Sequence, residues 1–214
     1  RVIIGVFFIL LCFMCLWYDL SLSTLLSNTV VRMGINASMV LAMVPGIQFC
    51  ISLNNLELHE NIRTIGSEAF SRTGLRKFTV PKTVTKTDDS IFNHCPFLES
   101  AVIKNNSISD YEFSECVMLS DVKMSDEIEK IGEGAFSNCI SLKDIKLSSN
   151  LKIIDKKAFY GTDLSSPVFP SGLTEIGDDS FRGCSRIKNV DLPESLKYIG
   201  AGSFANTEWQ KTNY

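Results

Sequence analysis

One complete repeat unit decides the fold: Phe136-Ser-Asn-Cys139-Ile-Ser-Leu142-Lys-Asp-Ile145-Lys-Leu147-Ser-Ser-Asn-Leu151-Lys-Ile-Ile154, followed by Asp-Lys-Lys-Ala158-Phe159. Phenylalanine recurs through the chain in steps of 21 to 23 residues, at Phe70, Phe92, Phe113, Phe136, Phe159, Phe181 and Phe204. Self-similarity at a fixed period of this length is the signature of a solenoid, whose units bury their apolar faces against one another.

Other apolar residues of the unit also return at fixed offsets. The position of Leu142 is shared by Leu53, Leu75, Leu98, Leu119, Leu164 and Ile187, and that of Leu147 by Leu58, Val80, Ile103, Met124, Phe169 and Leu192. The position of Ile154 is shared by Ile65, Ile108, Ile131, Ile176 and Ile199, and we expect each such column to be one layer of the core. Glycine or aspartate usually follows this isoleucine (Gly66, Gly132, Asp155, Gly177, Gly200), which predicts a left-handed corner.

A period of about 23 residues with an L-x-x-I-x-L element is too short for a helical hairpin and falls within the leucine-rich repeat range. Alternation of buried and exposed side chains predicts short strands such as 145–147 and 190–192, stacked in parallel from coil to coil. Pro81, Pro170 and Pro193 come directly after these segments, where a missing N–H ends the strand.

The unit Ile131-Gly132-Glu-Gly-Ala135-Phe136-Ser-Asn-Cys139-Ile-Ser-Leu142-Lys-Asp-Ile145-Lys-Leu147 resembles the BspA-like leucine-rich repeats. The resemblance covers about residues 50 to 209 and repeats about seven times. It implies a leucine-rich repeat solenoid, a β-rich α/β right-handed superhelix with a parallel sheet on one face and about seven coils of 21–23 residues. It also implies a non-catalytic surface module of the adhesin or surface-antigen type. The unit from Phe92 to Phe113 is two residues short, between Ile103 and Ile108, which predicts a bulge or a flattened corner there.

The chain of 214 residues divides into two regions by charge. Residues 1–50 hold three of the 45 formal charges, Arg1, Asp19 and Arg32. The uncharged run 2–18 predicts a signal peptide or a membrane segment in 1–25, with a buried core helix as the remaining alternative. Residues 26–49 are interpreted as an apolar N-terminal cap or a degenerate repeat, and 50–214 as the leucine-rich repeat domain. The first region favours a secreted or cell-surface protein that meets the membrane only through this segment.

Cysteine occupies one column of the repeat, three residues after the phenylalanine. Its members Cys50, Cys95, Cys116, Cys139 and Cys184 alternate with Thr73, Thr162 and Thr207, and the spacing to the next apolar residue is C-x-x-L but T-x-L. A position that accepts either residue type favours a ladder of buried free thiols over disulfides between coils. The spacing does not suit a zinc site, and no metal or other cofactor is expected.

No catalytic constellation is evident. His59 and His94 fall in different parts of the repeat, and the sequence contains no P-loop, G-x-S-x-G or H-E-x-x-H motif. A net charge of -3 gives no basic footprint for nucleic acid. We therefore expect no enzyme and no nucleic-acid partner.

The outward positions of the predicted strands are the best candidate binding surface, because both charge signs alternate there and suit a protein ligand such as a host or extracellular-matrix protein. The centre of this face comprises Asp121, Lys123, Asp144, Lys146 and Val168. The alternative is a structural spacer or cap fragment of a larger surface protein with no ligand of its own.

Overall fold

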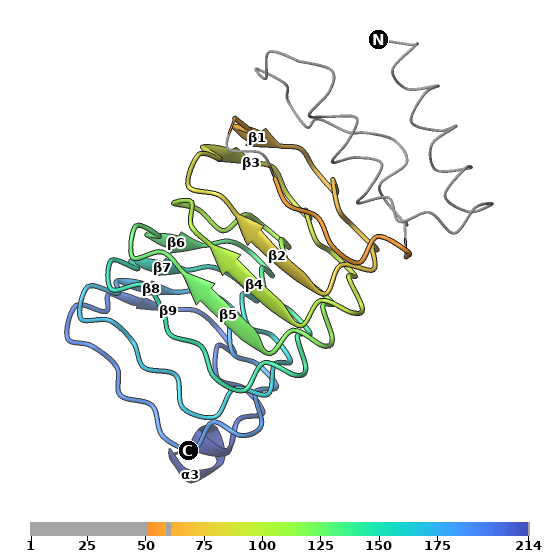
Figure 1. Ribbon diagram of the computed structural model, residues 1–214. Helices are drawn as coiled ribbons and strands as arrows, with labels where there is room; N and C mark the ends of the chain where they lie inside the picture. The colour runs from red at the N-terminus through yellow and green to blue at the C-terminus, as the bar shows by residue number, and fades with distance from the viewer. Residues whose placement is uncertain (1–50, 59–60, 214) are drawn as a thin grey trace, which may run out of the picture.

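The computed structural model describes residues 51–58 and 61–213. These residues form a leucine-rich repeat solenoid in which successive coils stack in parallel (Figure 1). The predicted signal or membrane segment 1–25 and the cap 26–49 lie outside the described residues, as do Cys12, Cys15, Cys50 and His59.

The first parallel sheet consists of β2 (Lys77–Val80), β4 (Ser100–Ile103) and β5 (Asp121–Met124), in the order β2-β4-β5. In β2 burial alternates as the pleat requires, with Phe78 and Val80 inside and Lys77 and Thr79 outside. The outward column runs in register from Thr79 to Val102 to Lys123. One face of this sheet is therefore core and the other is solvent.

The prediction of strands at 145–147 and 190–192 is wrong, because the chain passes through both segments without strand pairing. Pro167 lies in the coil between them and is buried. It has no N–H, so its own coil lacks one of the donors that a regular ladder uses. The regular sheet ends before this coil is reached, at β5.

A second set of parallel strands, which the sequence pattern did not predict, is built from the isoleucine column. It comprises β1 (Thr64–Ile65) paired with β3 (Lys86–Thr87), and then β6 (Lys130–Ile131), β7 (Ile153–Ile154), β8 (Glu175–Ile176) and β9 (Tyr198–Ile199) in the order β6-β7-β8-β9. The isoleucines point inward and are buried from Ile65 to Ile176, whereas Ile199 in the last coil is 44% exposed.

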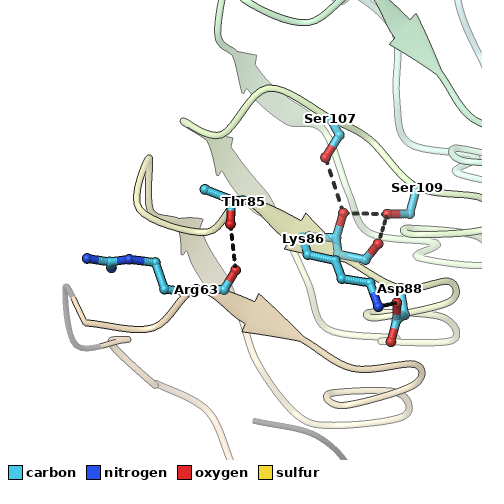
Figure 2. Close-up of polar contacts among 7 residues, drawn as sticks. Arg63, Thr85, Lys86, Asp88, Ser107 and Ser109 are labelled. Atoms are coloured by element: carbon cyan, nitrogen blue, oxygen red, sulfur yellow. Dashed lines mark hydrogen bonds and ion pairs between the residues drawn. The ribbon is translucent and has the colours of Figure 1, made fainter. Parts of the chain in front are cut away.

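The short coil interrupts this second set of strands. Ile108 forms only an isolated bridge to Ile131. Asn105 takes the buried place that Val84 and Ile128 hold in the neighbouring coils, and its Nδ2 donates to the carbonyl of Ser107 at 3.1 Å. Figure 2 shows the hydroxyl contacts that link this corner to the preceding coil, where Ser109 Oγ donates to Thr87 Oγ1 at 2.6 Å. The two missing residues thus coincide with a break in the second set of strands.

The repeated phenylalanines form one continuous stack through the core. Neighbouring ring centroids lie 5.2 to 5.5 Å apart and the rings are nearly parallel, with interplanar angles of 3° to 19°. All are fully buried except Phe204, which is 6% exposed. Trp209 of α3 (Glu208–Asn213) meets the Phe204 ring edge-on at 5.1 Å. The helix thus covers the end of the stack.

The predicted left-handed corner at the glycine after the isoleucine is wrong. Positive φ angles occur instead two residues before and two residues after the phenylalanines, as at Gly134 and Asn138 around Phe136. Gly177 and Gly200 are required for a different reason. A Cβ on Gly177 would lie 2.5 Å from the backbone nitrogen of Lys156, so glycine permits close approach of two coils.

Candidate functional site

Part of the candidate site lies on regular strands, on the exposed face of the sheet formed by β2, β4 and β5. Asp121 and Lys123 both point outward from β5 because they flank the buried Val122. Lys123 Nζ lies 3.6 Å from Asp121 Oδ2, so the two form an exposed ion pair. An ion pair of this kind contributes little to stability, which leaves both groups available to a partner.

Asp144, Lys146 and Val168 continue this face in the coils after β5, where the chain has no regular strand. Both charged side chains are exposed, and Val168 is 79% exposed. The backbone N–H and hydroxyl of Ser149 hold the pKa of the neighbouring Asp126 below its usual range, and the positive charge of Lys146 acts in the same direction. The five predicted residues therefore lie on the solvent side of three consecutive coils.

A shallow depression of about 350 Å³ at the carboxyl ends of β4 and β5 adds residues that the sequence pattern did not single out. Val102, Ile103 and Met124 line it, together with Lys104 and Lys123, and also Lys82 and Ser125. Lys82 is paired with Glu127 at 2.6 Å, whereas Lys104 forms no ion pair among the described residues. The depression brings apolar and cationic groups together at the edge of the candidate face.

The cysteine column lies in the core and is no part of this surface. Cys95, Cys116, Cys139 and Cys184 are free, and all four are completely buried. The thiol of Cys139 donates to the carbonyl of Phe113 in the preceding coil at 3.1 Å, and the other three make the equivalent bond to Phe70, Phe92 and Phe159. Burial raises the pKa of the Cys139 thiol well above its ordinary value and that of Cys184 to about 11, so these two thiols are poor nucleophiles.

Threonine makes a different hydrogen bond at the same position of the repeat. The hydroxyl of Thr162 donates to the carbonyl of Phe159, three residues earlier in its own coil, at 3.0 Å, and Thr73 and Thr207 do the same. The longer thiol reaches the preceding coil, whereas the shorter hydroxyl closes its own turn. This difference explains why the column accepts cysteine or threonine.

Glu112 is a buried acid that the repeat pattern did not single out. It precedes Phe113, in a column that holds alanine or serine in most other coils, and is completely buried. Its Oε2 accepts the backbone N–H of Ser109 at 2.7 Å, and its Oε1 has no partner. Burial raises the pKa of this carboxyl to about 8. The Ser-x-x-Glu spacing was the available signal, since it typifies a side chain that reaches back to a backbone N–H.

The described ranges contain no cluster of three or more histidine, cysteine or acidic residues that could hold a metal ion. His94 is exposed on a turn with a positive φ of 57°. None of the helices within 51–58 and 61–213 is long and apolar enough to cross a bilayer.

Comparison with known families assigns the repeat. The model of the BspA type leucine-rich repeat region matches residues 47–116 and 106–214, with six copies. The chain belongs to this family. Leucine-rich repeats of this class generally act as protein-interaction modules.

Solved structures support the assignment. A leucine-rich repeat protein from Bacteroides ovatus is 30% identical with a TM-score of 0.60, over 69% of this chain and 45% of that one. The leucine-rich repeat protein of T. pallidum is 25% identical with a TM-score of 0.53, over 55% of this chain and 59% of that one. A leucine-rich repeat protein from Eubacterium ventriosum, 22% identical with a TM-score of 0.65 over 70% of this chain and 42% of that one, shares the fold.

The BspA-type chain spans about half the length of these solved structures. No curated protein matches it significantly.

Proposed function

We propose that this chain is a secreted or cell-surface module that binds a protein ligand, such as a host or extracellular-matrix protein, through its strand face and without catalysis. The observation that supports this most directly is the continuous exposed mosaic of Asp121, Lys123, Asp144, Lys146 and Val168 across three coils. A surface with both charge signs complements a protein better than it complements a polyanion. The apolar leader-like segment 2–18 supports export.

The depression beside Lys123 is the part of the strand face best suited to supply affinity for a protein ligand. Charged pairs at a solvated surface contribute little on their own, and binding energy comes mainly from apolar contacts that exclude water. Val102 and Met124 supply such contacts next to Lys104 and Lys123. An acidic protein loop with one apolar side chain fits this combination.

The test is a panel of purified extracellular-matrix and cell-surface proteins probed with the full chain. We expect at least one salt-sensitive ligand, whose binding is weakened by Lys123→Glu with Lys146→Glu. The matched control is Lys156→Glu with Lys157→Glu, on the turn before Phe159, which should leave binding unchanged. Lys156 Nζ lies 3.9 Å from Glu133 Oε1, away from the strand face.

Two results would contradict the proposal. Equal weakening by both double variants would place the site on the turns. Absence of any ligand on the panel would favour a structural spacer.

A further inference from the structure

A second exposed surface arises from the two residues that separate cysteine from leucine in the C-x-x-L units. In three consecutive coils these residues are mostly apolar, and we call Pro96, Phe97, Val117, Met118 and Ile140 the apolar ridge. Phe97 is 38% exposed, Met118 42% and Ile140 58%. The ridge lies on the loops that lead into the tails of β4 and β5 in Figure 1, and on the corresponding loop of the next coil.

The ridge has sharp ends because the neighbouring coils lack the extra residue. Thr73-Gly74-Leu75 precedes it and Thr162-Asp163-Leu164 follows it, each with a single residue before the leucine. The next C-x-x-L unit has Ser185 and Arg186 at the equivalent places. The ridge is therefore three coils long, which corresponds to two steps of 5.2 and 5.4 Å between phenylalanine rings.

The core does not require these apolar side chains. The leucines that follow them, Leu98, Leu119 and Leu142, are completely buried and close the core without them. Single apolar side chains on a surface are ordinary, but a contiguous group usually marks an interaction site. Ser185 and Arg186 show that the same turn accepts polar residues.

The charges beside the ridge indicate the chemistry of its partner. After the three leucines come Glu99, Ser120 and Lys143. Glu99 is paired with Arg76 at 2.7 Å, whereas Lys143 forms no ion pair within the described residues. On the other side of the ridge, Glu115 accepts the amide of Asn138 at 2.6 Å. Among the described residues, Lys143 is thus a cation beside the ridge without an ion-pair partner, three residues after the exposed Ile140, whereas Glu115 keeps its negative charge despite its hydrogen bond to Asn138.

We propose that the apolar ridge is a docking surface for an extended segment of a partner protein that presents apolar side chains and an acidic residue over Lys143. A second copy of this chain is a poorer occupant. A stable dimer needs roughly 800 Å² of contact per partner, and three exposed side chains on a ridge about 10 Å long fall well short of that. An extended segment needs only a few anchoring side chains in a row.

The experiment selects random peptides of about twelve residues, displayed on phage, against the immobilised full chain. We expect enrichment of peptides with two or more apolar residues and an aspartate or glutamate. A selected peptide, made synthetically, should bind at least about tenfold more weakly to the variant Phe97→Ser with Met118→Ser and Ile140→Ser. The matched control Val168→Ser removes an exposed apolar side chain from the strand face and should not change binding. Lys143→Glu should weaken acidic peptides selectively.

Thermal unfolding of each variant checks the fold, and Ile140→Ser alone replaces the triple variant if that variant is destabilised. The proposal is overturned if no peptide is enriched, or if the selected peptides bind the ridge variant as tightly as the parent. A ridge-dependent dimer in sedimentation equilibrium would identify a second copy as the occupant and also contradict it.

The ridge and the strand face are tested separately. Lys123→Glu with Lys146→Glu should retain peptide binding even if it abolishes binding on the protein panel. Loss of peptide binding in that variant would place the peptides on the strand face and contradict the ridge proposal.

Discussion

A single phenylalanine in each coil links the sequence period to the core. Its spacing was sufficient to predict a continuous stack, because side chains at one offset of a solenoid must meet their equivalents in the next coil. Which backbone carbonyl accepts the hydrogen bond of each cysteine thiol was not predictable. It depends on whether the side chain reaches the preceding coil, as Cys139 does, or its own turn, as Thr162 does.

The buried phenylalanine should dominate local stability. Phe136 stacks between Phe113 and Phe159, with ring centroids 5.4 Å away on both sides. Phe136→Ala removes a ring from a filled stack and should lower the free energy of unfolding by about 3 to 5 kcal/mol in urea denaturation. Phe97→Ala, on the exposed turn, should cost about 1 kcal/mol or less. Similar losses from the two changes would show that the stack is not the core.

Glu112 should make stability depend on pH. Its pKa of about 8 in the folded protein lies above the ordinary value of 4.5, so the folded state keeps a proton that the unfolded chain releases. The stabilisation is complete below about pH 4.5, decreases as pH rises toward 8 and is absent above that.

Glu112→Gln cannot ionise, so its advantage over the parent should grow between pH 4.5 and 8, to on the order of 4 kcal/mol. Urea denaturation across this pH range measures the difference. Glu194→Gln, which changes an exposed acid, is the control and should follow the parent. Parallel pH profiles for Glu112→Gln and the parent would contradict the buried acid.

At the scale of elements, the sequence predicted the first sheet and missed the second. Apolar alternation predicted a strand in every coil, whereas the sheet comprises only β2, β4 and β5. The strands β6 to β9 are two residues long, too short for alternation to be recognised. The residue after each isoleucine was assigned to a left-handed corner, not to the end of a strand. The close approach of coils at Gly177 became evident only from the positions of backbone atoms.

This close approach gives a paired prediction on glycine. In Gly177→Ala the new Cβ would meet the backbone of Asp155 and Lys156 at 2.5 to 2.7 Å, and neither atom can move without shifting a coil. We expect a loss of about 1 to 3 kcal/mol in the free energy of unfolding. Gly172→Ala meets nothing within 4 Å and should be neutral or slightly stabilising. Equal effects of the two substitutions in denaturant titration would mean that the coils are not in contact there.

At the scale of the whole molecule, the candidate site is a consequence of repetition. Sequence columns predicted which side chains face solvent, including Lys123 and Lys146, because outward positions follow directly from the period. They did not predict the depression at Val102 and Met124, which depends on how far neighbouring side chains extend. They also did not predict the apolar ridge, which depends on the exposure of the two residues between cysteine and leucine.

If the coils are equivalent layers of one solenoid, a complete coil can be removed without loss of the fold, and deletion of one coil tests this most directly. Removing residues 137–159 keeps every column in register, because Phe136 then leads into the turn of Thr162. We expect a folded protein with one cooperative urea transition and a maximum dimension in small-angle X-ray scattering shortened by about 5 Å. Removing residues 143–154, half a coil, should abolish folding. An unfolded product from the whole-coil deletion, or a folded product from the half-coil deletion, would contradict the account.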